Sequence, residues 1–208
     1  MRHFSYLISF LSHPIWFPIY GAMLVLFNIP FFLPIEEVRW AWLMLLIFTV
    51  ALPTLIYLTL FVLNWIKDPF VVPIEKQKWL LYGYIAILLG VAFKITPMEN
   101  FPILYFYLLN LIISCFLLLF LQFLGWSTNW YTMGMGALTI FAILLSISFE
   151  KDMTCLLAFF IFLSGASFTA QTYLTQQELW LLLLSWGIGA LPQLSLLVLF
   201  KNLLFGLQ

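Results

Sequence analysis

Apolar stretches of about twenty residues, separated by short charged or proline-containing breaks, run through this 208-residue chain. Each stretch is long enough to cross a hydrocarbon core of roughly 30 Å as an α-helix. The stretches lack the period-two alternation of a transmembrane barrel, so helices are favoured. With 65% hydrophobic and 8% charged residues, the chain is also too apolar for a soluble domain, whose surface must stay largely polar. We therefore predict an all-α, multi-pass integral membrane bundle.

Seven spans are predicted, within a single transmembrane domain over residues 1–208. Their approximate ranges are 14–34, 40–65, 79–95, 101–124, 132–149, a run from 153 that becomes polar between 164 and 177, and 178–200. The number falls to six if the short first run is re-entrant or interfacial. Pro53 is expected to kink the second span. Short loops predict antiparallel neighbours in a compact bundle.

With seven spans, the second, fourth and sixth loops lie on the same side of the membrane as the N-terminus. These segments are residues 66–78, the uncharged stretch 125–136, and the polar passage 164–178. Polar segments that meet at one end of a bundle commonly build a membrane-embedded site. The cations divide equally between the two sides, so the positive-inside rule gives no orientation. They are Arg2, Lys67, Lys76 and Lys78 on one side and Arg39, Lys94, Lys151 and Lys201 on the other.

The residue inventory excludes several kinds of site. A formal net charge of zero gives no reason to expect a nucleic-acid partner. The only histidines are His3 and His13, without carboxylates at ligand spacing, so no metal or haem site is predicted and no cofactor is expected. No histidine lies in the three polar loops, so a serine hydrolase triad cannot be assembled there.

Neutral polar residues inside the spans are interpreted as structural. We expect the six amide side chains to form hydrogen bonds between helices, and the small-residue pairs to permit close helix contact. The amides are Asn28, Asn64, Asn110, Gln122, Gln171 and Gln193, and the pairs are Gly134/Gly136, Gly165/Ala166 and Gly187/Gly189.

The uncharged stretch carries a family resemblance. The segment LGWSTN at 124–129, followed by MGMGAL at 133–138, resembles small bacterial membrane proteins of the type 2 phosphatidic acid phosphatase superfamily. The segment SHP at 12–14 and the pair YG at 20–21 are similar to the start of those proteins. The second motif of that superfamily is Ser-x-His at the mouth of a helix. The resemblance implies that Ser127 matches the motif serine and that Asn129 stands where the acid histidine belongs.

The other two motifs are also degenerate. In the first, Lys76 and Lys78 keep positive charge, but the proline that closes the motif is absent. In the third, the resemblance places Ser167, within Ala166-Ser167-Phe168, near the arginine position and Tyr173 near the nucleophilic histidine. No histidine or arginine occurs between Lys151 and Lys201.

These departures remove the family's chemistry. The family mechanism proceeds through a phosphohistidine and needs a nucleophile, an acid and a cationic clamp. Tyrosine is a poor replacement nucleophile because its pKa is about 10, and an asparagine amide cannot protonate a leaving alcohol. We predict no catalytic residue.

The sequence therefore favours a non-catalytic, phosphatase-like bundle that serves as a scaffold or accessory subunit of a larger complex in the bacterial inner membrane. Its expected partners are membrane lipids and other membrane subunits. The alternative is a protein that binds a lipid headgroup through Lys76, Lys78, Ser127 and Asn129. An active phosphatase with unrecognised residues, or a small transporter, remains as a further alternative. The residues assigned to the vestigial site are Lys76, Lys78, Ser127, Asn129, Ser167 and Tyr173.

Overall fold

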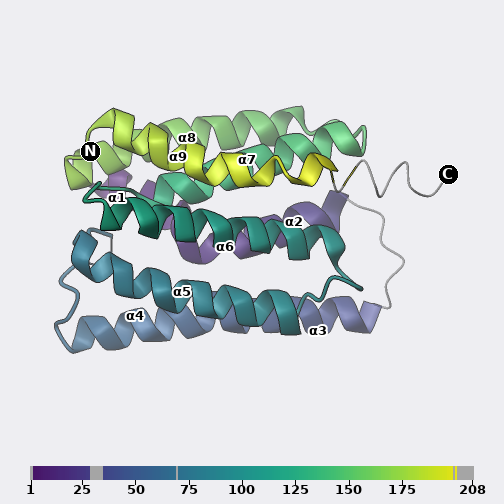
Figure 1. Ribbon diagram of the computed structural model, residues 1–208, viewed down its shortest axis with the longest axis horizontal. Coiled ribbons are helices and arrows are strands. Elements are labelled where there is room, and N and C mark those ends of the chain that lie inside the picture. Colours follow the sequence, from purple (N-terminus) through teal and green to yellow (C-terminus); the bar gives the residue numbers. More distant parts are fainter. Residues whose placement is uncertain (1, 29–34, 69, 199, 201–208) are drawn as a thin grey trace.

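The computed structural model describes residues 2–28, 35–68, 70–198 and 200. These residues form helices and connections without a strand (Figure 1). The helices are α1 (Arg2–Leu11), α2 (Phe17–Asn28), α3 (Ile35–Leu46), α4 (Leu52–Val62), α5 (Ile74–Lys94), α6 (Pro102–Phe123), α7 (Trp130–Ser148), α8 (Thr154–Thr175) and α9 (Leu179–Gln193). A 3-10 turn, Pro14–Trp16, joins α1 to α2, and a π-helical turn, Ile47–Ala51, joins α3 to α4.

Six helical stretches in the described residues are long and apolar enough to cross a membrane. They are Arg2–Asn28, Ile35–Val62, Pro102–Phe123, Trp130–Ser148, Thr154–Thr175 and Leu179–Val198. The protein is thus a multi-pass helical integral membrane protein, as predicted. The remaining helix, α5, runs alongside α3 and α4 (Figure 1) but carries charges at both ends, from Glu75 to Lys94. Of the seven predicted spans, the third, α5, is therefore the one that is not apolar enough to count as a membrane span. The first predicted span, which was expected to be the doubtful one, is long and apolar enough.

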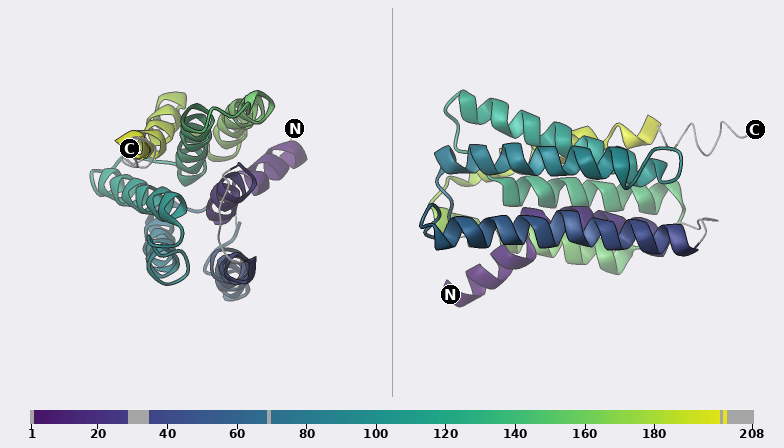
Figure 2. Two further views of the ribbon diagram at one scale, coloured as in Figure 1. Left: turned by 90° about the vertical axis from the view of Figure 1, so that its right-hand side faces the viewer. Right: turned by 90° about the horizontal axis from the view of Figure 1, so that it is seen from below.

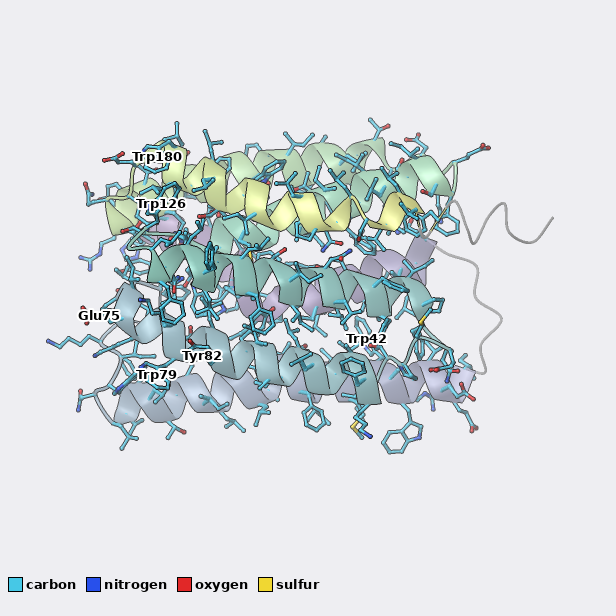
Figure 3. All side chains as sticks on the ribbon, in the orientation of Figure 1. Trp42, Glu75, Trp79, Tyr82, Trp126 and Trp180 are labelled. Carbon is cyan, nitrogen blue, oxygen red and sulfur yellow. The ribbon has the colours of Figure 1, made fainter. Side chains whose placement is uncertain are left out.

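Aromatic side chains mark the end of the bundle that holds the N-terminus, which we call the N-terminal face (Figure 3). Trp79, Trp126 and Trp180 lie near this end and are exposed. The Trp126 and Trp180 rings meet edge to face, with centroids 5.6 Å apart. Tryptophan is typical of the membrane–water interface, where one side of the ring is wet and the other apolar.

The first span starts earlier than the sequence pattern predicted, at Arg2 rather than Pro14. The helix is interrupted at His13, because Pro14 cannot supply a backbone N–H. Two buried tyrosines bond carbonyls that follow the interruption: the Tyr84 hydroxyl donates to the Pro14 carbonyl at 2.7 Å, and that of Tyr107 to the Phe17 carbonyl at 2.9 Å. The predicted end at residue 34 lies outside the described residues.

The expected irregularity around Pro53 takes the form of the π-helical turn that precedes it. A proline cannot donate to the carbonyl four residues before it, here that of Thr49. The widened turn takes up this misfit within one continuous span. The Thr49 hydroxyl is buried and donates to the Leu45 carbonyl at 2.8 Å.

Two of the predicted loops are shorter than expected. Helix α5 begins at Ile74, so Lys76 and Lys78 belong to its first turns rather than to a loop. Helix α8 continues to Thr175, so most of the polar passage 164–178 is helical. The predicted boundaries were wrong because they followed the ends of the apolar runs. A helix continues beyond its apolar run when its polar side chains find hydrogen-bond partners.

Helices α7 and α9 are in close backbone contact. A Cβ atom on Gly136 would lie 2.0 Å from the Trp186 carbonyl oxygen, and one on Gly189 would lie 1.8 Å from that of Met133. The predicted role of small residues is confirmed there and at Gly134, where the Phe17 ring fills the space. It is wrong at Gly165 and Gly187, which face open space.

The intramembrane amides partly follow the prediction. Gln193 donates to the Tyr107 carbonyl of another helix at 3.4 Å, and Asn110 accepts from the Ser195 hydroxyl at 3.1 Å. Asn28 instead bonds within its own helix, to the Leu24 carbonyl. Gln122 is buried without a hydrogen-bond partner in the described part of the chain, and Asn64 lies in a turn with φ of 55°. Gln171 has the most extensive network, at the N-terminal face.

Candidate functional site

Three connecting segments meet at the N-terminal face, as the span count predicted (Figure 1). They are residues 63–68 with 70–73, residues 124–129 and residues 176–178. A hollow of about 300 Å³ lies between them and the adjoining helix ends. We call it the amide hollow, because its polar lining includes Gln77, Asn129, Gln171 and Gln177.

Asn129 begins α7 as its N-cap. Its backbone is extended, with φ −127° and ψ 116°, and its Oδ1 accepts from the backbone N–H groups of Tyr131 at 3.0 Å and Thr132 at 3.2 Å. Asparagine is among the preferred caps because its side-chain oxygen satisfies N–H groups that the first turn leaves unpaired. The oxygen of Asn129 is therefore committed to the helix start.

The nitrogen of the same side chain connects two glutamines. Asn129 Nδ2 donates to Gln171 Oε1 at 3.0 Å and to Gln177 Oε1 at 2.9 Å. We call these three residues the amide cluster. A primary amide offers two N–H donors and one oxygen acceptor. The Asn129 side chain uses all of them within the protein.

Further bonds extend the cluster to α1 and α9. Gln171 Nε2 donates to the Ser9 hydroxyl at 3.0 Å, and the Asn129 backbone N–H donates to the Ser185 hydroxyl at 2.9 Å. Ser185 in turn donates to the Leu181 carbonyl at 2.8 Å. Ser9, Gln171 and Ser185 are fully buried. The network thus connects α1, α8 and α9 at the residue that begins α7.

The amide hollow is electrically neutral. None of the described residues that line it is a lysine, arginine, histidine, aspartate or glutamate. Amides and hydroxyls can orient a polar group, but they cannot neutralise a phosphate or exchange a proton near neutral pH. A phosphate placed here would be desolvated without a counter-charge, which is strongly unfavourable.

Two of the sequence-predicted site residues line this hollow, namely Ser127 and Asn129. Ser127 is half-buried, and its backbone carbonyl accepts from Gln177 Nε2 at 3.4 Å. Lys76 and Lys78 do not line the hollow. Residues two apart on a helix point about 200° apart, and Gln77, between the two lysines, takes the inward position.

The two lysines make other contacts. Lys76 Nζ donates to the Trp65 carbonyl and lies 5.3 Å from the Trp65 ring centre. Lys78 Nζ lies 4.9 Å from the centre of the Phe123 ring. Both ammonium groups therefore lie over aromatic rings at the interface, a favourable placement for a cation.

The two third-motif residues lie elsewhere on α8. Ser167 is buried, and its hydroxyl donates to the Ser12 hydroxyl at 3.3 Å. Tyr173 is exposed and lines a separate, charged hollow with Arg2. Ser167 is one helical turn from Gln171, and its partner Ser12 lies just after the end of α1, whereas Gln171 bonds Ser9 within α1.

Sequence reasoning missed Gln171 and Gln177 as site residues. The sequence pattern indicates Gln171 only as one of several intramembrane amides, and Gln177 only as part of a polar passage. The available signal was a strongly polar, uncharged side chain in an apolar helix, which is unfavourable in a membrane unless it is partnered. Its partner could not be identified without the packing of α8 against α1 and α7.

Comparisons of the chain with known protein families, with characterised proteins and with solved structures found no match. The functional interpretation therefore depends on the geometry of the N-terminal face and on the motif resemblance.

Proposed function

We propose that this chain is a non-catalytic member of the phosphatidic acid phosphatase-like bundles, acting as a scaffold or accessory subunit of a larger complex in the bacterial inner membrane. The observation that carries this proposal is the state of Asn129. It occupies the position of the family's acid, and every hydrogen-bonding group of its side chain is used to hold α7, α8 and the last loop together.

The geometry supports a revised match for the third motif. In an active phosphatase the nucleophile, the acid and the cationic clamp act on one phosphate, so the residues of the three motifs must converge. The residues that converge on Asn129 are Gln171 and Gln177. The pair Ala170-Gln171 also begins with alanine, as does the pair Ala166-Ser167 four residues earlier. We therefore match Gln171 to the arginine and Gln177 to the nucleophilic histidine.

With this match, amides occupy three chemical positions of the resembled site. An acid, a cation and a nucleophile are replaced by Asn129, Gln171 and Gln177, and both glutamines accept a hydrogen bond from Asn129 Nδ2. Such an exchange removes proton transfer and charge neutralisation while it keeps the helices connected. It supports retention of the bundle for its shape rather than for its chemistry.

The same geometry gives less support to headgroup binding at the vestigial site. That alternative needs Lys76 and Lys78 beside Ser127 and Asn129, but both ammonium groups lie over aromatic rings outside the amide hollow. A neutral hollow has no long-range attraction for a phosphate.

The role as a subunit is supported by apolar surface on several helices. α3–α4 buries few residues, and α8 also presents large exposed side chains such as Phe159 and Phe162. Helices in membranes associate through close packing of such faces. Lipid covers these faces wherever no partner subunit does.

Native mass spectrometry of the gently extracted chain tests this role. We expect a complex of fixed stoichiometry that contains another membrane polypeptide and survives exchange into a second mild detergent. A membrane protein of similar size, extracted from the same cells, serves as the control. Recovery of the chain only as a monomer in both detergents would contradict the subunit role.

A further inference from the structure

A second hollow at the N-terminal face differs sharply from the amide hollow in charge. It has a volume of about 800 Å³, and its lining includes Arg2, Lys67 and Lys76 together with one carboxylate, Asp68. Asp68 is already engaged: Oδ2 accepts from the Tyr6 hydroxyl and Oδ1 from the Phe70 backbone N–H, both at 2.8 Å. We call this region the cation hollow.

The cations of this hollow are available to an anion. No ion pair involving Arg2, Lys67 or Lys76 occurs within the described ranges of the chain. The Arg2 guanidinium lies 5.8 Å from the centre of the Tyr6 ring, and Lys76 uses one donor on the Trp65 carbonyl, although an ammonium has three. Three cations against one bonded carboxylate leave a net positive site.

One face of α1 leads from this hollow towards the membrane interior. Arg2, Tyr6 and Phe10 are spaced four residues apart in α1, the spacing that places side chains along one side of a helix. The Tyr6 ring meets the Phe70 ring edge to face at 5.5 Å. Figure 2 shows that α1 runs obliquely to the other helices.

An apolar slot continues from that face. It has a volume of about 320 Å³, lies between α1 and α4, and is lined by Phe10, His13, Tyr57, Leu58 and Phe70, among others. Tyr6 lines the cation hollow and Phe70 lines the slot. Because the rings of these two residues are in contact, the two spaces are neighbours. The slot is the right environment for a hydrocarbon chain.

One residue that lines the slot, Tyr57, carries a polar group that is unpartnered within the described ranges. The Tyr57 hydroxyl is buried and has no hydrogen-bond partner among the described residues, which is unfavourable for a group that can both donate and accept. α4 itself is weakly embedded, since Pro53 is its only buried residue. Figure 2 places α3–α4 at the periphery of the bundle.

We propose that an anionic phospholipid binds across these two spaces, with its phosphate among Arg2, Lys67 and Lys76 and an acyl chain in the slot between α1 and α4. Charge complementarity selects the anionic head, and the adjoining apolar slot selects a lipid over a free phosphate. The bound chain fills the space beside α4 and fastens α3–α4 to the bundle. This site adjoins the amide hollow, with which it shares Val71, Pro73 and Leu174, but its three cations do not line that hollow. The proposal does not depend on the family resemblance.

The test measures lipid retention by the purified full-length chain. Native mass spectrometry in a neutral detergent should show retained phosphatidylglycerol and little retained phosphatidylcholine. The triple variant Arg2→Gln, Lys67→Gln, Lys76→Gln should lose phosphatidylglycerol affinity by roughly a hundredfold, because each cation near an anionic lipid contributes about fivefold. The single variant Lys67→Gln, in an exposed loop position, should lose about fivefold.

A matched triple variant, Arg39→Gln, Lys94→Gln, Lys151→Gln, removes three cations of the opposite face and should retain the lipid. An equal loss in that variant would overturn the proposal, because it would indicate a general charge effect. Leu58→Trp narrows the slot and should weaken phosphatidylglycerol retention. No effect of Leu58→Trp, or competition by glycerol phosphate as strong as by the lipid, would also overturn it and indicate a headgroup site alone.

Discussion

Gly189→Ala is expected to destabilise the bundle, although it adds a single methyl group and favours helix formation. The new Cβ would lie 1.8 Å from the Met133 carbonyl oxygen and 2.9 Å from the Ala137 nitrogen. Both are backbone atoms of α7, so relief requires α7 and α9 to separate. Overpacking of this kind costs about 3 kcal/mol, which corresponds to a fall in Tm of roughly 6–12 °C for a chain of this size.

Gly187→Ala provides the matched control, two residues away on the same helix. A Cβ at Gly187 meets nothing within 4 Å, and alanine is favoured over glycine in a helix by about 1 kcal/mol. We therefore expect an unchanged or higher Tm. Thermal unfolding in detergent, followed by circular dichroism, compares the two variants. Equal Tm values would show that α7 and α9 are not in the close contact described here.

Asn129→Ala is expected to lower stability by a similar amount, for a different reason. It removes the cap of α7, which is worth about 1 kcal/mol. It also leaves the buried Gln171 oxygen without its donor, at a cost of about 1–3 kcal/mol. The unfolding measurement should report a combined loss of about 3 kcal/mol.

Two further variants separate the contributions. Asn129→Ser keeps an oxygen that can cap α7 but has no amide to reach the two glutamines, so its stability should lie between those of wild type and Asn129→Ala. Ser127→Ala removes a hydroxyl that makes no hydrogen bond to the described residues and keeps the Ser127 carbonyl, to which Gln177 donates. It should be nearly neutral. A Ser127→Ala loss as large as that of Asn129→Ala would contradict the assignment of the amide cluster.

The membrane class and the convergence of the three loops were predictable because both follow from the length and number of apolar runs. The starts of α1 and α5 were not. Arg2, Glu75 and Lys76 read as loop residues in a hydrophobicity pattern, but near a membrane interface they extend the helix into the polar layer. The long α8 was likewise missed, because its serines, threonines and Gln171 have partners on neighbouring helices.

At the site, Ser127 and Asn129 could be placed together from the sequence because they lie two residues apart in one segment. The residue of α8 that reaches Asn129 could not, since a shift of four residues along α8 preserves the helical face. Gln171 bonds Ser9 of α1, and Ser167 bonds Ser12, just after the end of α1. Only the depth at which α8 packs against the start of α7 determines which of them reaches Asn129.

Phosphate release by the chain in lipid vesicles is the most direct test of a non-catalytic role. Vesicles that contain phosphatidic acid and the purified protein should release no more phosphate than vesicles without protein, at any protein concentration. The variants Gln177→Ala and Ser127→Ala provide the comparison, with Gly187→Ala as a control outside the amide cluster. Turnover by the wild type and Gly187→Ala that either of the other two variants abolishes would contradict the account and assign chemistry to the amide hollow.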